Sequence, residues 1–221
     1  MTKINGIIFD MDGLLVDSES VYYEGTQLVA DQYQLPYTKA TYLQSLGLSD
    51  QAMHQMYHEQ YDELIGHSNV EAFIHESYTY CYELLASGAA TLKPGVNELF
   101  AYCELQGIQK VVASSNTREL ITLLLTKAGI IDQFTAIFSV EDVPQAKPDP
   151  ALFLKAQKWL DLPKEELLVL EDSRNGILAA HAAAIPVIMI PDLLPAPADI
   201  ERLVTLESLH QVPAYLQNLN P

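Results

Sequence analysis

Basic residues are scarce in this chain. Its 12 Lys and Arg stand against 29 Asp and Glu, which gives a formal net charge of −17 at pH 7. Binding to nucleic acid or to an anionic membrane surface requires cations that neutralise phosphates. The charge balance therefore argues against both classes of partner.

Cysteine and long hydrophobic runs are also lacking. Cys81 and Cys103 are the only cysteines, so the sequence has neither a disulfide framework nor the close Cys spacing of a metal site. No stretch approaches the ~18 consecutive apolar residues of a membrane span. The first apolar run starts at Ile4 and belongs to a predicted strand, so we expect no secretory signal peptide. We expect a cytoplasmic, monomeric protein with reduced cysteines.

The sequence does contain short apolar runs that alternate with helical patterns. The runs lie at 7–9, 110–115, 136–139, 167–172 and 186–190, and helical patterns lie at 95–107, 117–129 and 149–160. Continuous apolar strands that alternate with helices indicate a parallel sheet covered on both faces. We therefore expect an α/β fold with a doubly wound, Rossmann-like parallel sheet. Residues 195–219 are expected to form a loop and one or two short surface helices.

The gap between the first two apolar runs is too long for a simple crossover, which needs only about a dozen residues. Helical patterns within this gap lie at 19–34, 38–46, 49–65 and 70–87. The sequence thus predicts an α/β core domain at 1–14 and 94–221 and an all-helical cap domain inserted at 15–93. The segments 14–18 and 91–95 are expected to form two connecting strands.

Polar residues gather after the apolar runs, where the strands of the predicted sheet end. They are Asp10 and Asp12 after the first run, Ser114, Ser115 and Asn116 after the second, Lys147 after the third, and Glu171 and Asp172 after the fourth. In an open α/β sheet, ligands bind beyond the carboxyl ends of the strands, where the strand order reverses. Each residue alone also fits a turn or a helix cap. Independent turn residues would rarely produce this set in this order.

This set of side chains suits phosphoryl transfer. One carboxylate can attack phosphorus and form an aspartyl-phosphate, and a second can protonate the leaving oxygen and then activate water. Mg²⁺ prefers hard oxygen ligands, which Asp10, Asp172 and the backbone carbonyl of Asp12 would supply. The hydroxyl, amide and ammonium donors after the second and third runs would hold the phosphate oxygens, where the charge lies.

Four motifs, DMDGLLVDS, VVASSN, AKPDP and LEDSRNGI, resemble in order and spacing those of the haloacid dehalogenase superfamily. The resemblance covers the whole chain. Within the superfamily, the sequence is similar to the branch that contains β-phosphoglucomutase and small sugar-phosphate phosphatases. This resemblance implies a Mg²⁺ cofactor and a small phosphate-ester substrate. It implies that Asp10 is the nucleophile and that Asp12 is the general acid and base. It implies that phosphate or substrate is bound by Ser114, Ser115, Asn116 and Lys147. It also implies that the metal ligands are Asp10, Asp12 and Asp172, and that Glu171 is a metal ligand or supports one.

The sequence of the predicted cap bears on the choice of substrate. Residues 15–92 contain eleven Asp and Glu but only one basic residue, Lys39. The mutase members of the resembling branch have a histidine and a cap arginine where this chain has Tyr22 and Asp50. A mutase must hold a second phosphate, which requires cations. A phosphatase of singly phosphorylated metabolites is therefore the leading expectation, and a hexose-phosphate mutase is the alternative.

Three other possibilities are less favoured. A phospho-acceptor regulatory domain is a remote alternative, because it needs no cap and Asp12 would hasten loss of the phosphate. Dehalogenase activity needs neither a metal nor a second acid beside the nucleophile. His54 and His58 are four residues apart on a helical pattern, but they have no third ligand nearby in the sequence. We therefore expect no metal site in the insert.

Overall fold

The computed structural model describes residues 3–219, and the chain divides into two compact units. One unit comprises Met1–Asp17 and Thr91–Pro221, and the other comprises Ser18–Ala90. The predicted insert, 15–93, extends three residues beyond the helical unit at each end. The assignment of catalytic and cap roles to the two units stays a prediction.

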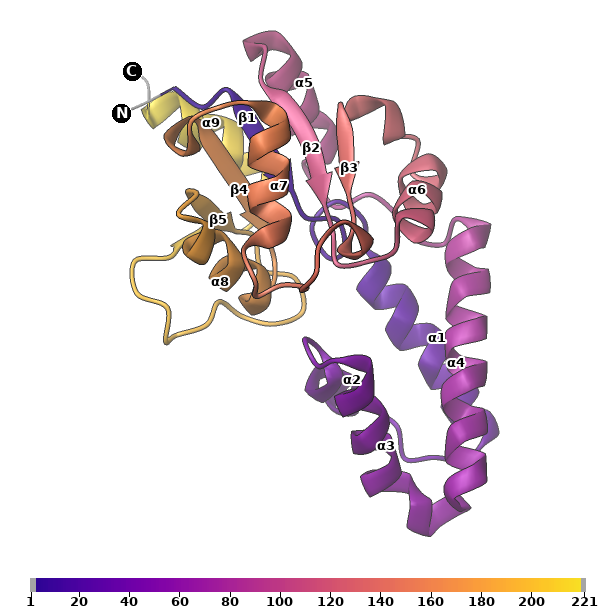
Figure 1. The fold of residues 1–221 in the computed structure, drawn as a ribbon. Coiled ribbons are helices and arrows are strands. Elements are labelled where there is room, and N and C mark those ends of the chain that lie inside the picture. The colour runs from indigo at the N-terminus through magenta and orange to yellow at the C-terminus, as the bar shows by residue number, and fades with distance from the viewer. Residues whose placement is uncertain (1–2, 220–221) are drawn as a thin grey trace. The chain divides into compact units, whose positions relative to one another are not determined.

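The first unit is built around a six-stranded parallel sheet with the order β3-β2-β1-β4-β5-β6 (Figure 1). Its strands are β1 (Gly6–Phe9), β2 (Gln109–Ala113), β3 (Ala136–Phe138), β4 (Leu167–Glu171), β5 (Val187–Met189) and β6 (Val204–Thr205). In β1, Ile8 pairs with Val111 of β2 on one side and with Val169 of β4 on the other. The strand order reverses at β1, which confirms the predicted doubly wound parallel sheet.

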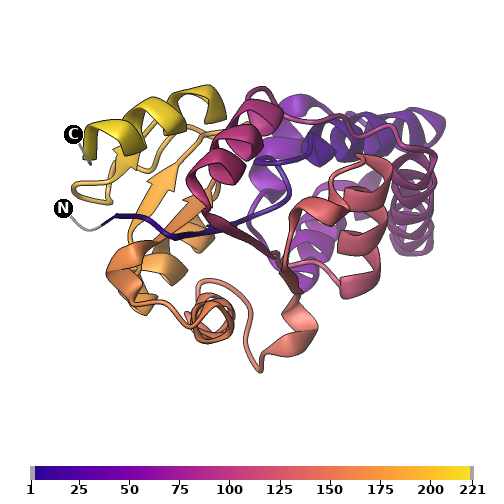
Figure 2. The same cartoon turned by 90° about the horizontal axis from the view of Figure 1, so that it is seen from above.

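Helices of the first unit cover both faces of this sheet. They are α5 (Val96–Gln106), α6 (Arg118–Lys127), α7 (Ala151–Leu160), α8 (Arg174–Ala183) and α9 (Val212–Leu219). Short 3₁₀ turns occur at Ile131–Gln133, Val140–Asp142, Lys164–Glu166 and Leu209–Gln211. Figure 2 shows α5 and α9 on one side of the sheet and α7 and α8 on the other.

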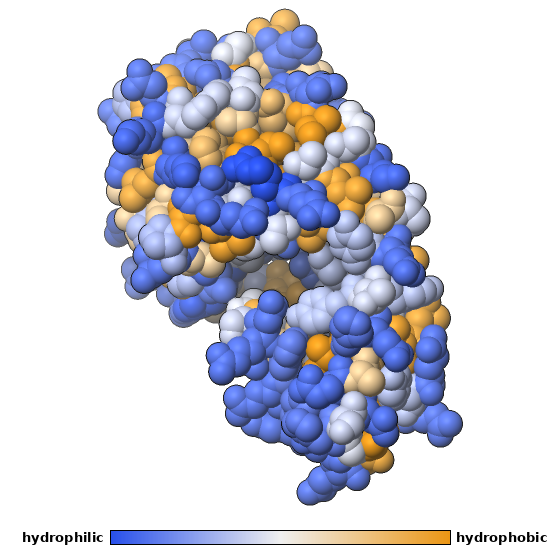
Figure 3. All heavy atoms as spheres, turned by 45° about the vertical axis from the view of Figure 1, so that its right-hand side comes forward, coloured by the Kyte–Doolittle hydropathy of each residue, from blue (hydrophilic) through white to orange (hydrophobic). Residues whose placement is uncertain are grey.

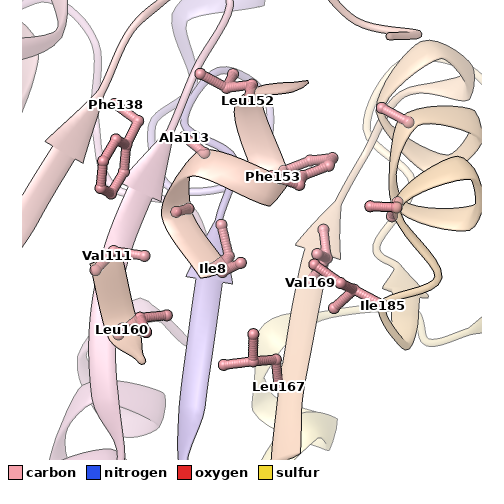
Figure 4. Packing of buried hydrophobic residues seen from close by; sticks show 14 residues of the cluster. Ile8, Val111, Ala113, Phe138, Leu152, Phe153, Leu160, Leu167, Val169 and Ile185 are labelled. Atoms are coloured by element: carbon pink, nitrogen blue, oxygen red, sulfur yellow. The ribbon is translucent and has the colours of Figure 1, made fainter. Parts of the chain in front are cut away.

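The two faces of β1 explain its apolar sequence. Ile8 belongs to a buried cluster with residues of α7 and α8 (Figure 4). The next residue, Phe9, lies edge-on to Phe100 of α5, with 5.6 Å between ring centroids. Successive side chains of a strand point to opposite faces. Both faces of β1 are therefore buried, and the strand is a continuous apolar run rather than an alternating one.

The C-terminal segment differs from the prediction. The sequence predicts only a loop and short helices for 195–219, whereas Val204–Thr205 forms β6 and pairs in parallel with β5. This strand has two residues, one half-buried and one exposed. A strand of this length is too short to show the alternation of apolar and polar residues, or the apolar run, by which strands are predicted from sequence.

The segments on either side of the helical unit also differ from the prediction. The expected connecting strands at 14–18 and 91–95 reduce to one antiparallel bridge between Val16 and Leu92. Backbone bonds from Asp17 N–H to the Thr91 carbonyl and from Lys93 N–H to the Leu15 carbonyl flank this bridge. The segment where the chain leaves the first unit and the segment where it returns are therefore hydrogen-bonded to each other within that unit.

The second unit consists of α1 (Ser18–Gln32), α2 (Lys39–Ser45), α3 (Asp50–Ile65) and α4 (His67–Ser87). Its core is aromatic, and the ring of Phe73 packs edge-on against Tyr37 and Tyr61. The surface of this unit in the lower part of Figure 3 is mainly hydrophilic. No helix within residues 3–219 is both long and apolar enough to cross a membrane.

Candidate active site

The carboxyl end of β1 places Asp10 where the strand order reverses. The backbone N–H of Asp10 donates to the carbonyl of Leu170 at 3.0 Å and so extends the pairing of β1 with β4. The chain then turns at Gly13, whose φ of 71° lies in the left-handed region that favours glycine. Asp10 is buried and fixed to the sheet, whereas Asp12 lies in the turn and is half-buried.

Lys147 joins the ends of three strands. Its ammonium donates to Asp10 Oδ1 at 2.6 Å, to Glu171 Oε1 at 2.7 Å and to the backbone carbonyl of Ala113 at 3.0 Å. These contacts use all three of its N–H donors. The side chains of Lys147 and Glu171 are 3% and 0% exposed. Removing one member would leave an uncompensated buried charge, so the cluster fixes the ends of β1, β2 and β4 together.

Burial and charge act in opposite directions on the pKa values of this cluster. The pKa of Asp10 is raised to about 8, and burial of the carboxyl is the main cause. The carboxylates of Glu171 and Asp12 add to this rise, whereas the ammonium of Lys147 opposes it. Burial lowers the pKa of Lys147, but Asp10 and Glu171 raise it, and the net shift is upward. The site thus holds more carboxylate than one ammonium neutralises, and a further cation would favour ionised Asp10.

Three carboxylates of this site could hold a metal ion. Asp10, Glu171 and Asp172 each offer an oxygen, and these oxygens lie within 4.8 Å of one another. Hard carboxylate oxygens are the protein ligands that Mg²⁺ takes up. The donor set and the surplus of negative charge both fit this ion. The predicted contribution of Asp12 is a backbone carbonyl, which this cluster of side chains does not test.

The residues after β2 hold Asp12. The amide of Asn116 donates to Asp12 Oδ2 at 2.7 Å, and the hydroxyl of Ser114 donates to the same oxygen at 3.4 Å. Ser114 is fully buried, and its hydroxyl accepts from the Asn116 N–H at 3.1 Å. Ser115, which was predicted to offer its backbone amide, is exposed. The structure thus gathers at one sheet edge the predicted side chains of Asp10, Asp12, Ser114, Asn116, Lys147, Glu171 and Asp172.

The first turn of α8 fixes Glu171. A β-carbon at Gly176 would lie 1.7 Å from Glu171 Oε1, so only glycine leaves room for this carboxylate. Ser173 caps α8 by accepting from the Gly176 N–H at 3.1 Å. Its hydroxyl and its backbone N–H both donate to Glu171 Oε2 at 2.9 Å. Each oxygen of Glu171 therefore accepts a hydrogen bond, one from Lys147 and the other from Ser173.

Two residues that border this site, Lys93 and Asp192, are not among those predicted from the sequence. Lys93 Nζ and Asp192 Oδ1 form an ion pair at 2.5 Å, and the Asp192 side chain is 7% exposed. A β-carbon at Gly13 would lie 2.9 Å from Asp192 Oδ2 and 2.5 Å from Asp172 Oδ2. Both carboxylates therefore border the turn after β1. Asp192 follows a predicted strand and could have been found by the rule that selected the others. Nothing in the sequence pairs it with Lys93.

Comparison with known proteins identifies the family. The model of haloacid dehalogenase-like hydrolases matches residues 7–190. The chain belongs to this family. Hexitol phosphatase B of Escherichia coli (strain K12) is 31% identical over 192 residues, which are 86% of this chain and 84% of that protein. The phosphorylated carbohydrates phosphatase of Thermotoga maritima is 28% identical over 183 residues, 82% of each chain.

A solved structure shares the fold of this haloacid dehalogenase-like hydrolase. CbbY from Rhodobacter sphaeroides in complex with phosphate matches with a TM-score of 0.75 at 22% identity. The match covers 95% of this chain and 96% of that chain. The resemblance inferred from the four motifs is thereby confirmed at the level of family and fold. The roles of individual residues stay predictions.

Proposed function

We propose that this hydrolase is a Mg²⁺-dependent phosphatase of small phosphorylated metabolites such as sugar phosphates. The observation that carries the proposal is the buried cluster of Asp10, Lys147 and Glu171 at the end of β1, where the strand order reverses, with Asp12 beside it. The names of two relatives, hexitol phosphatase and phosphorylated carbohydrates phosphatase, support the substrate class.

Asp10 is the nucleophile in this proposal. Lys147 engages its Oδ1, so we assign the attack on phosphorus to Oδ2. The Oδ2–P bond forms as the bond from phosphorus to the ester oxygen breaks, and an aspartyl-phosphate results. Attachment of Asp10 to the end of β1 restricts its motion, which helps to hold the reacting atoms in a productive geometry.

Asp12 carries the proton in both halves of the reaction. It gives a proton to the leaving ester oxygen and later takes one from the water that attacks the aspartyl-phosphate. This second attack breaks the Oδ2–P bond, which releases phosphate and restores the Asp10 carboxylate. Hydrogen bonds from Asn116 and Ser114 would keep the Asp12 carboxylate oriented for both steps.

Lys147 must exchange a hydrogen bond to reach a phosphate oxygen, because all three of its donors are engaged. The carbonyl of Ala113 is its only neutral acceptor of the three, and hydrogen bonds to charged acceptors are stronger. We therefore expect Lys147 to release Ala113 and to keep Asp10 and Glu171 when it binds the substrate phosphate.

Asp10, Asp172 and the backbone carbonyl of Asp12 would hold Mg²⁺. When bound, the ion supplies positive charge that offsets the repulsion between a carboxylate nucleophile and a phosphate dianion. Glu171 is better suited to support than to direct ligation, because Lys147 and Ser173 already donate to its two oxygens.

Phosphate release from a panel of sugar phosphates, hexitol phosphates, phosphoglycolate and nucleotides tests the proposal. We expect hydrolysis of sugar or hexitol monophosphates that a chelator abolishes and added Mg²⁺ restores. Asp10→Asn should reduce the rate to background. Asp161→Asn is the matched control, because Asp161 is exposed at the end of α7. Robust hydrolysis without metal, or an active Asp10→Asn enzyme, would refute the mechanism.

A further inference from the structure

The helical unit contains a cluster of histidine and carboxylate side chains at the junction of α3 and α4. His58, Asp62 and His67 each offer one ligand atom, and these atoms lie within 4.8 Å of one another. His58 Nδ1 lies 2.7 Å from Asp62 Oδ1, and His67 Nδ1 lies 3.2 Å from Asp62 Oδ2. The two imidazole rings stack with 4.2 Å between centroids. Both Nδ1 atoms therefore converge on one carboxylate.

This cluster differs from the histidine pair that the sequence singles out. The spacing of His54 and His58 suggested a pair without a third ligand, but the ring of His54 lies against Tyr78 instead. The companions of His58 are Asp62, four residues later on α3, and His67 at the start of α4. The third ligand comes from the next helix, which the helical spacing of α3 alone cannot reveal.

Gly66 is the backbone feature that builds the cluster. It is the single residue between α3, which ends at Ile65, and α4, which begins at His67. Its φ of 84° is one that L side chains rarely adopt, and its N–H donates to the Asp62 carbonyl at 2.9 Å. This one-residue link reverses the chain at once and brings His67 against the last turns of α3.

We propose that His58, Asp62 and His67 form a Zn²⁺ site with water as the fourth ligand. Imidazole nitrogens and a carboxylate oxygen are ligands that Zn²⁺ takes up, and three protein ligands with one exchangeable position are a common set. Ligand atoms that are each ~2.1 Å from a tetrahedral ion lie ~3.4 Å apart. His58 and His67 contact different oxygens of Asp62, at 2.7 and 3.2 Å, and the ligand atoms of all three residues lie within 4.8 Å of one another. Rotations of these side chains would therefore bring the ligand atoms to tetrahedral distances.

Glu71 strengthens the assignment. Its Oε1 lies 2.7 Å from His58 Nε2. When the Nε2–H donates to this carboxylate, the Nδ1 lone pair is left for the metal. Metal-bound histidines in proteins commonly have this second hydrogen bond, which fixes the tautomer and the ring orientation. Glu71 is thus a positioning residue for His58.

The chemistry of the ligands separates this site from the proposed Mg²⁺ site. Mg²⁺ prefers oxygen ligands and holds its water tightly, so it competes poorly where two of three donors are imidazoles. The His67 side chain is 69% exposed, so an ion can reach the cluster from solvent. A simple ion pair between protonated His58 and its two carboxylates is the competing explanation of the same contacts.

Titrations of the full chain with Zn²⁺ by calorimetry, and with Co²⁺ by visible absorption, test the proposal. Both are done with excess Mg²⁺ at mildly alkaline pH, where fewer protons compete with the metal for its ligands. We expect one Zn²⁺ per chain and Co²⁺ absorption bands typical of four ligands. His67→Gln and His58→Gln should each weaken binding by at least ~10-fold, and Glu71→Gln should weaken it by ~10–100-fold.

His75→Gln is the matched control, because His75 is exposed on α4 outside the cluster. It should bind Zn²⁺ as the unaltered chain does, and phosphate release should be the same in all four variants. Because His67 is exposed, His67→Gln should fold as the unaltered chain does, and circular dichroism checks this. Absence of Zn²⁺ binding, or binding that neither His58→Gln nor His67→Gln weakens, would leave only the ion pair and overturn the proposal.

Discussion

Asp10 and Asp12 are two residues apart but lie in different surroundings. Asp10 is buried against an ammonium group, whereas Asp12 is half-buried and accepts from the neutral amide of Asn116. A nucleophile benefits from rigid placement, and a group that shuttles protons must reach both the ester oxygen and water. Under the proposed function, the two environments therefore match two different roles.

Asp12→Asn should separate these roles. The variant keeps the nucleophile but loses the proton shuttle, whose help is typically worth ~10²–10⁴-fold in rate. We expect such a loss of turnover on a sugar phosphate, whose leaving group is poor. With an aryl phosphate, whose leaving group is good, Asp10 should still become phosphorylated slowly and should accumulate in that form. Rapid-quench detection of phosphoenzyme measures this, and near-normal turnover of a sugar phosphate by Asp12→Asn would contradict the assignment.

Helix α8 shows how one element serves both fold and site. Its cap, Ser173, donates to Glu171, and its first turn contains the Gly176 that makes space for the same carboxylate. Glu171 in turn accepts from Lys147. The start of α8 thus holds the buried ion cluster in place as well as packing against the sheet.

Gly176→Ala tests this coupling at the scale of the element. Helix propensity alone would stabilise the variant by ~1 kcal/mol, but the new methyl must displace Glu171 from Lys147. Breaking a buried ion pair costs ~3–5 kcal/mol, so we expect a net loss of stability and of turnover. Urea unfolding measures the first and phosphate release the second.

The control for this experiment is Ala182→Gly, at an exposed position of the same helix. This variant makes the opposite exchange of glycine and alanine at a position away from Glu171. It should lower the free energy of unfolding by ~1 kcal/mol without loss of turnover. A Gly176→Ala variant as stable and as active as the unaltered chain would show that Glu171 can move without consequence.

Charge is the property of the whole molecule that bears on the type of reaction. The chain has 12 basic residues in all. Within residues 3–219, five of them form ion pairs with carboxylates in the first unit, namely Lys93, Arg118, Lys147, Lys155 and Arg174. A mutase must bind a bisphosphate in two orientations and needs cations for the distal phosphate. Under the predicted role of the helical unit as a cap, the scarcity of basic residues in 15–92 favours hydrolysis over isomerisation.

Kinetics with β-glucose 1-phosphate decide between these reactions. We expect release of inorganic phosphate and no conversion to glucose 6-phosphate, with or without a hexose bisphosphate as primer. The two products are measured in the same reaction, by phosphate detection and by a coupled dehydrogenase. Formation of glucose 6-phosphate faster than phosphate would favour the mutase over the phosphatase, whereas phosphate release from several monophosphates would support the phosphatase.

The sequence by itself determined the parallel sheet except for its short edge strand β6, the family and most of the candidate site. Asp10 and Glu171 each sit at the end of a continuous apolar run, and such runs are local patterns that burial on both faces of a sheet imposes. The rule that ligands gather at the carboxyl ends of strands then places these residues together without any coordinates. The same local rule was available for Asp192, which was missed.

Only the tertiary structure decided which of these residues touch. Lys147 and Asp10 are 137 positions apart, and Lys93 and Asp192 are 99 apart, so their pairing depends on how helices and strands pack. The meeting of His67 with His58 likewise depends on the backbone turn at Gly66. A local pattern records which face of an element is buried, but a contact between two elements is fixed by the geometry of both, and no single stretch of sequence contains it.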